Sequence, residues 1–137
     1  MKIEEDIKLD FNDVLFRPKR STLSSRKEVD MEREFTFKYS GRKWKGVPII
    51  SSNMDTVSSV SMFKKLSQHK ILTCFHKFID IKEVITAVKE GSDPQYMMLS
   101  TGITEPDYEK LLLNVSLLHN EDIDLQFICI DVANGYM

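Results

Sequence analysis

The stretch of sequence that decides the fold is residues 49–57, Ile-Ile-Ser-Ser-Asn-Met-Asp-Thr-Val. An apolar run that follows Pro48 gives way to polar residues around a methionine, and a helical pattern comes next. A buried strand whose C-terminal end turns polar just before a helix is where α/β proteins place their chemistry. The same pattern recurs at residues 71–77, 96–102 and 125–135. We therefore expect four strands that each end in polar residues.

Amphipathic helices are predicted between these strands. Ser58 is expected to cap the first helix, Asp80 caps the second, which Gly91 closes, and Glu105 with Pro106 starts the third. Near-continuous apolar strands alternating with such helices indicate a parallel sheet covered by helices. The strands are expected at residues 47–51, 72–75, 96–99 and 125–130.

Two architectures fit an α/β pattern of this kind, an open doubly wound sheet and a (β/α)₈ TIM barrel. No Gly-x-Gly-x-x-Gly motif follows the first strand, so the usual dinucleotide fingerprint is absent. Polar ends on every successive strand favour a barrel, because all its loops converge on one mouth. A whole barrel needs about 250 residues. Residues 47–137 therefore predict the first half of a barrel, strands 1–4 and helices 1–3, and we expect the chain to be part of a longer enzyme.

Residues 1–46 do not follow this pattern and are interpreted as a short antiparallel β appendage before the half-barrel. Residues 9–16 alternate apolar and polar side chains, which predicts a short strand. Residues 35–39 alternate again, and residues 40–43 are typical of a hairpin turn before Trp44. The sequence thus predicts two parts, 1–46 and 47–137.

Composition excludes several classes of function. The net charge of −2 gives no support for a nucleic-acid partner, and no apolar run approaches the roughly 20 residues of a membrane span. The N-terminus is acidic and lacks the apolar core of a signal peptide, so a cytoplasmic protein is expected. Cys74 and Cys129 lie in apolar runs, which favours buried thiols in a reducing compartment. Histidines and cysteines show no metal-ligand spacing, so no metal site is expected in this segment.

Several residues at the strand ends are candidates for chemistry. Asp55 and Asp131 could meet a ligand or serve as helix N-caps. Lys77, beside His76, could direct its ammonium group to a phosphate, a carboxamide oxygen or an anionic intermediate, or be an exposed loop lysine. Met54 could stack on a planar ring or fill the core. The residues alone leave these alternatives open.

Four motifs together resemble the IMP dehydrogenase/GMP reductase family. They are residues 9–19 (Leu-Asp-Phe-Asn-Asp-Val-Leu, then Arg-Pro-Lys), 47–57, 76–77 (His-Lys) and 130–136 (Ile-Asp-Val-Ala-Asn-Gly-Tyr), in the family's order. The resemblance runs from about residue 7 to the end and implies a (β/α)₈ barrel that works as a homotetramer.

Two features favour the reductase branch of this family over the dehydrogenase branch. Asn53 stands where dehydrogenases usually have proline, and the segment between Lys77 and Asp131 leaves no room for their usual regulatory modules. Ser51-Ser52 favours the dehydrogenase branch, because many reductases have Ala-Ala there.

The resemblance implies NADPH-dependent reductive deamination of GMP to IMP and ammonia, through a covalent thioimidate on a cysteine. The alternatives are an IMP dehydrogenase-type oxidoreductase, or an inactive fragment or assembly module. By the resemblance, the nucleophilic cysteine and the potassium loop lie beyond residue 137, and neither Cys74 nor Cys129 is the nucleophile.

The same resemblance assigns residues to the site. Beyond the resemblance, we add the hypothesis that Lys77 and Asp131 assist proton movement when ammonia leaves, because they carry opposite charges that converge on one mouth. Ser52 and Met54 are expected to face the purine nucleotide. Ser25 and Arg26 are expected to contact NADPH bound to a neighbouring subunit. The full set expected to bind the cofactor is Ser25, Arg26, Lys77, Asp131, Val132 and Ala133.

Overall fold

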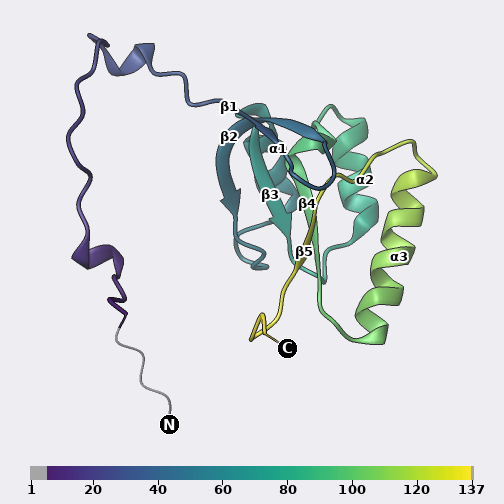
Figure 1. The fold of residues 1–137 in the computed structure, drawn as a ribbon. Coiled ribbons are helices and arrows are strands. Elements are labelled where there is room, and N and C mark those ends of the chain that lie inside the picture. Colours follow the sequence, from purple (N-terminus) through teal and green to yellow (C-terminus); the bar gives the residue numbers. More distant parts are fainter. Residues whose placement is uncertain (1–5, 137) are drawn as a thin grey trace. The chain divides into compact units, whose positions relative to one another are not determined.

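The structure is a computed structural model that describes residues 6–136 (Figure 1). It divides into two compact units, one up to Asp30 and one from Met31 onward. The predicted division at residues 46 and 47 falls inside the second unit, within a continuous strand.

The N-terminal unit contains two short 3₁₀ helices, η1 (Phe11–Asp13) and η2 (Arg26–Glu28). The strand predicted over residues 9–16 is wrong. The Asp10 carboxylate accepts a hydrogen bond from the Phe11 amide at 2.7 Å, and the Asp13 carboxylate accepts from the Asp10 amide at 2.9 Å. Because aspartate side chains compete in this way for backbone donors, the alternating pattern forms a capped turn instead.

The second unit begins with a β-hairpin, whose first strand lies earlier than the predicted 35–39 and whose second strand begins at Lys43, inside the predicted turn. Strand β1 (Arg33–Thr36) pairs antiparallel with β2 (Lys43–Ser51). Gly41 has φ +66°, the left-handed conformation that glycine adopts without steric cost, at the turn between them. Strand β2 then continues as the first parallel strand, so one strand carries both the hairpin and the start of the parallel sheet.

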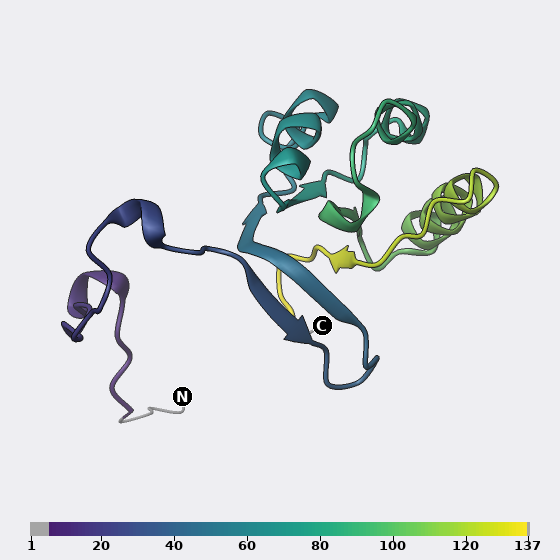
Figure 2. The same cartoon turned by 90° about the horizontal axis from the view of Figure 1, so that it is seen from above.

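The parallel strands β2, β3 (Ile71–Phe75), β4 (Met97–Thr101) and β5 (Ile128–Ile130) are neighbours in chain order, β1-β2-β3-β4-β5. Helices α1 (Val60–Gln68), α2 (Ile81–Lys89) and α3 (Glu105–His119) connect them and lie on one side of the sheet (Figure 2). Strand β5 is shorter than the predicted 125–130. Its pairing with β4 begins only at Leu99 and Ile128, and the 3₁₀ helix η3 (Pro94–Tyr96) precedes β4.

The helix ends confirm two of the three predicted start signals. Asp80 caps α2, and Gly91, with φ +104°, follows its C-terminal end. Helix α3 begins at Glu105, as predicted, and Thr104 caps it. The cap of α1 is Ser59, whose hydroxyl accepts from the Met62 amide at 3.2 Å, and not the predicted Ser58.

The core has two parts, one on each face of the sheet. Between the sheet and the helices, Phe63 and Phe75 are fully buried edge to face, with ring centroids 5.3 Å apart. Successive strand residues point to opposite faces, so Leu72 faces the other side. There it packs with Trp44, whose Nε1 donates to the Gln95 carbonyl at 3.1 Å.

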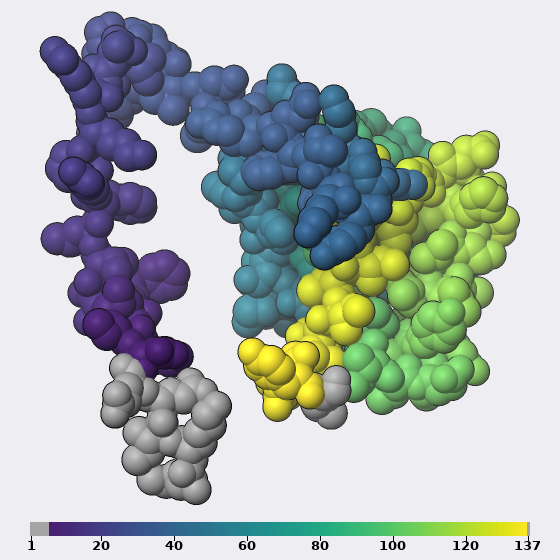
Figure 3. Space-filling view, in the orientation of Figure 1, coloured from purple at the N-terminus to yellow at the C-terminus, as the bar shows by residue number. Residues whose placement is uncertain are grey.

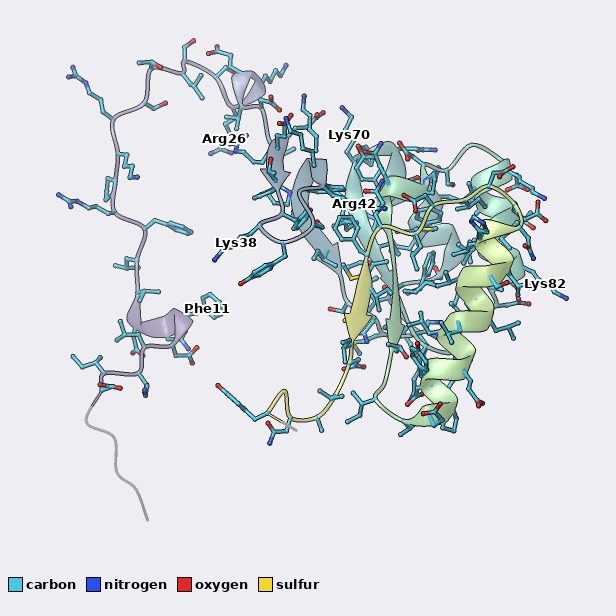
Figure 4. The ribbon with its side chains drawn as sticks, turned by 45° about the vertical axis from the view of Figure 1, so that its right-hand side comes forward. Phe11, Arg26, Lys38, Arg42, Lys70 and Lys82 are labelled. Atoms are coloured by element: carbon cyan, nitrogen blue, oxygen red, sulfur yellow. The ribbon has the colours of Figure 1, made fainter. Side chains whose placement is uncertain are left out.

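Strand β5 is one of the two edge strands of this sheet and is uncovered in the space-filling view (yellow in Figure 3). Its Ile128 and Ile130 are 49% and 65% exposed. At the hairpin, Arg42 pairs with Asp124 at 3.1 Å, which ties the turn to the segment before β5 (Figure 4). Within residues 6–136 no helix is both long and apolar enough to cross a membrane.

Candidate functional site

The C-terminal ends of the four parallel strands lie at one edge of the sheet, as they must when strands run in the same direction. Predicted site residues therefore lie at one edge although they are far apart in the sequence. Those in the second unit are Ser52, Met54, Lys77, Asp131, Val132 and Ala133.

The first link between strand ends joins Asn53, after β2, to Asp131, after β5. The Asn53 side-chain amide donates to Asp131 Oδ2 at 2.8 Å. The backbone amide of Asp131 also donates to the Thr101 carbonyl at 2.8 Å, which extends the pairing of β5 with β4 by one residue. Asp131 is thus held through both its backbone and its side chain.

Asn53 is itself fixed by a buried serine. Ser58 is fully buried, and its hydroxyl donates to the Ser52 carbonyl and lies 3.1 Å from the Ser51 hydroxyl. The amides of Val57 and Ser58 both donate to the Met54 carbonyl, at 2.9 and 2.8 Å. Ser58 therefore closes the turn that carries Asn53, which is why the next serine caps α1.

The second link joins Lys77, after β3, to Asp107, in the first turn of α3. Lys77 Nζ lies 3.3 Å from Asp107 Oδ1, and the Thr104 hydroxyl donates to Asp107 Oδ2 at 2.6 Å. These hydrogen bonds, that of Thr104 first, hold the pKa of Asp107 below its ordinary value. Gly102 makes room for this carboxylate, because a Cβ there would lie 2.2 Å from Asp107 Oδ2.

Lys77 and Asp131, predicted to act together, lie at the same edge but bond to different partners. Lys77 pairs with Asp107, and Asp131 accepts from Asn53. Lys77 Nζ also lies 5.5 Å from the centroid of the Phe78 ring. His76 Nδ1 accepts from the Phe78 amide at 3.3 Å, which is a local contact within the turn after β3.

For Met54 and Asp55 the structure excludes one of the two roles that the sequence left open. Met54 is 56% exposed and does not fill the core. Asp55 is exposed within the turn and caps no helix, since Ser59 caps α1. Ser52 and Ala133 are exposed and Val132 is half-buried.

Ser25 and Arg26 belong to the N-terminal unit. Ser25 caps η2, and its hydroxyl accepts from the Lys27 amide at 3.3 Å. Arg26, the first residue of η2, is exposed (Figure 4). Their predicted role towards a neighbouring subunit stays a prediction.

The two cysteines are free thiols on the face of the sheet opposite the helices. Burial raises the pKa of Cys74 to about 12, and the adjoining Cys129 and Asp131 add to this shift. Because the thiolate is the nucleophilic form, Cys74 is not suited to covalent catalysis at neutral pH.

Sequence reasoning missed Asp107 as a partner of Lys77. Thr104-Glu105-Pro106-Asp107 carries the spacing of a capping box, which the structure forms, and this signal could have located the carboxylate. No group of three or more metal-ligating side chains occurs in the part of the chain that the structure describes.

Comparison with known proteins places this arrangement in a family. Residues 8–137 match the IMP dehydrogenase / GMP reductase domain. The chain is 51% identical to proteins named GMP reductase from Vibrio vulnificus and Tolumonas auensis, and 50% identical to one from Klebsiella pneumoniae. Each comparison covers 99% of this chain but only 38–39% of the relative's length. The chain therefore belongs to the IMP dehydrogenase/GMP reductase family.

Proposed function

We propose that this chain is the N-terminal part of a GMP reductase, which converts GMP to IMP and ammonia with NADPH. The observation that carries this proposal is the identity of about one half with proteins named GMP reductase, over nearly the whole chain. In the same proposal the chain forms the first half of a (β/α)₈ barrel.

The order of the strands supports a half-barrel. The strands are neighbours in chain order, without the reversal that creates the crevice of a doubly wound sheet. Right-handed crossovers in one direction put every helix on the same face, as Figure 2 shows for α1, α2 and α3.

The face of the sheet opposite the helices, which would be the inner face of the barrel, supports the same proposal. Cys74 pairs with Met98 and Cys129 with Ser100, so the two cysteines lie two strands and two residues apart in register. The Cys129 thiol nevertheless lies close enough to add to the raised pKa of Cys74. An offset of two residues over two strands corresponds to a shear of about 8 over eight strands, the value of this barrel. Side chains of alternate strands meeting in one layer are also characteristic of its interior.

The residues at the strand ends fit the nicotinamide end of NADPH. A carboxamide offers both a donor and an acceptor, and this edge carries an ammonium group on Lys77 and a carboxylate on Asp131. Val132 and Ala133 would contribute backbone groups, and the planar guanidinium of Arg26 suits a ribose phosphate. NADPH would supply the hydride for the reduction.

In this proposal the chain's own residues orient the ligands and move a proton. Lys77, held in place by Asp107, would donate a proton to the departing amine and would regain one from solvent, relayed by the Asp131 carboxylate. Ser52 and Met54 would face the purine nucleotide. Lys77→Met is expected to lower the rate of deamination, and a change confined to the KM for NADPH would contradict the role in proton transfer.

The remaining parts of the proposal lie outside this segment. The cysteine nucleophile and a potassium site would come from residues beyond 137, and the enzyme would be a cytoplasmic homotetramer with a cofactor site shared between neighbouring subunits. The 137 residues alone are expected to be inactive.

The second candidate is an IMP dehydrogenase-type enzyme, favoured by Ser51-Ser52. The deciding experiment uses the longer protein that contains this chain. Its activity is measured with GMP and NADPH and, separately, with IMP and NAD. We expect NADPH oxidation to depend on GMP. NAD reduction that depends on IMP, with no turnover of GMP, would refute the reductase proposal.

A further inference from the structure

We propose that Asn53 is a positioning residue that fixes the Asp131 carboxylate at the edge of the sheet where the parallel strands end. The inference rests on the proposed function, in which Asp131 meets the nicotinamide end of the cofactor and the departing amine. It assigns to Asn53 the task of occupying one carboxylate oxygen, so that the other oxygen is presented to the ligand.

The contact between Asn53 and Asp131 is one that a flat sheet would not produce. Asn53 follows β2 and Asp131 follows β5, and two strands lie between them. Neighbouring strands are about 4.8 Å apart, so three spacings separate the two strands by about 14 Å along a flat sheet. Side chains of a flat sheet stand perpendicular to it. The 2.8 Å bond therefore requires the strand ends to converge over the inner face.

Both ends of the bond are held by buried or backbone contacts. On one side the buried Ser58 hydroxyl binds the Ser52 carbonyl, which precedes Asn53 directly. On the other side the Asp131 amide bonds the Thr101 carbonyl at 2.8 Å. A side-chain bond between two fixed backbones restricts the rotamer of each partner, as a positioning contact must.

The chemistry of the donor also fits this task. An amide is neutral, so it orients the carboxylate and leaves its charge available to a ligand. Lys77, the candidate cation on this edge, is paired with Asp107 instead. Lys77 and Asp131 therefore each bond to a different partner, Asp107 and Asn53 respectively.

The kinetic test uses the longer protein with Asn53→Ala, Asn53→Gln, Asp131→Asn and the double variant Asn53→Ala/Asp131→Asn. Misplacing a reacting group by about 1 Å can cost on the order of 100-fold. We expect Asn53→Ala to lower kcat by roughly tenfold or more, with a smaller change in the KM for NADPH. Asn53→Gln keeps the amide donor and is expected to recover part of the loss.

The double variant separates positioning from a general structural role. If Asn53 acts through Asp131, then Asn53→Ala should cost nothing further once the carboxylate is an amide. An equal loss in both backgrounds, or no loss at all, would overturn the inference. Asn120→Ala is the matched control, because Asn120 is exposed at the C-terminal end of α3, which runs back from the strand ends.

A second measurement reads the contact without reference to activity. Urea unfolding of the 137-residue chain with Asn53→Ala, Asp131→Ala and both should show a double variant less destabilised than the sum of the single variants. Additive losses would overturn the inference. If the wild-type protein does not turn over GMP with NADPH, the proposed function fails and the catalytic role of Asn53 fails with it, whereas the unfolding cycle still reports whether the bond exists.

Discussion

Gly46→Ala is expected to destabilise this protein strongly although it adds only one methyl group. Gly46 lies within β2, where the strand passes close to the start of β3. A Cβ at this position would lie 2.6 Å from the backbone carbonyl oxygen of Lys70 and 2.6 and 2.7 Å from two ring carbons of Trp44. Carbon atoms in contact are about 3.5–4.0 Å apart, so the methyl group would overlap both neighbours by about 1 Å.

Neither neighbour can withdraw without losing other contacts. The Lys70 carbonyl accepts from the Val47 amide at 2.8 Å. The Trp44 side chain is 4% exposed and donates to the Gln95 carbonyl. Its ring also packs edge to face against the rings of Tyr96 and Phe127. An extra methyl group in a well-packed core costs about 1–3 kcal/mol. With both walls fixed, we expect a loss near the upper end, about 2–3 kcal/mol.

The assay is thermal unfolding of the 137-residue chain, followed by far-ultraviolet circular dichroism. For a unit of roughly 100 residues, each kcal/mol shifts the Tm by about 4–8 °C, so Gly46→Ala should lower the Tm by about 10 °C or more. Gly135→Ala is the control, because no atom lies within 4 Å of its added Cβ. Its free energy of unfolding is expected to stay within about 0.5 kcal/mol of the wild type.

A further variant tests the cause of the loss. Trp44→Leu removes the ring carbons that the new methyl group would meet, so Gly46→Ala should cost less in that background. A Tm of Gly46→Ala equal to that of the wild type, or the same cost with and without the Trp44 ring, would refute the packing argument.

Three further predictions concern buried or charged side chains. The hydroxyl of Thr73 is fully buried and has no hydrogen-bond partner among residues 6–136, so Thr73→Val should raise the free energy of unfolding in urea by about 1 kcal/mol; a loss would show that the hydroxyl is bonded. The pKa of Asp107 is lowered in the folded state, so its stabilisation is present above its ordinary value of 3.8 and is lost as the pH falls through the folded value. Asp107→Asn should therefore lose less Tm than the wild type between pH 7 and pH 3, and parallel curves would contradict this. The pKa of Cys74 is raised from 9.0 to about 12, so its stabilisation is complete below pH 9 and is lost as the pH rises towards 12. Cys74→Ala should lose less Tm than the wild type between pH 8 and pH 10, and iodoacetamide should not label Cys74 in the folded chain at pH 8.

The order and type of the parallel strands and helices could be predicted from the sequence, because local patterns determine them. Apolar runs and helical spacing placed β3, α2 and β4 within a residue or two. The most reliable local signals were an aspartate that caps a helix with its side chain and glycines that adopt positive φ. Asp80 capped a helix, and Gly41 and Gly91 took positive φ values where a turn and a helix end were predicted.

The wrong predictions arose where two local signals competed. Residues 9–16 alternate like a strand, but aspartate side chains bind the neighbouring amides, and among residues 6–136 this segment pairs with no strand. Ser58 and Ser59 are equally good caps by sequence. Only the packing of α1 against the sheet decided that Ser58 would be buried on the Ser52 carbonyl.

The sequence by itself determined that polar residues would follow each strand, and motif order determined the family. Only the tertiary structure decided which of these residues meet: Asn53 with Asp131, and Lys77 with Asp107. The physical reason is the sequence separation of the residues involved. Where a strand ends depends on side chains that are neighbours in the chain. Which side chains meet beyond the strand ends depends on the curvature of the sheet and on where α3 begins, and packing across the whole sheet determines both.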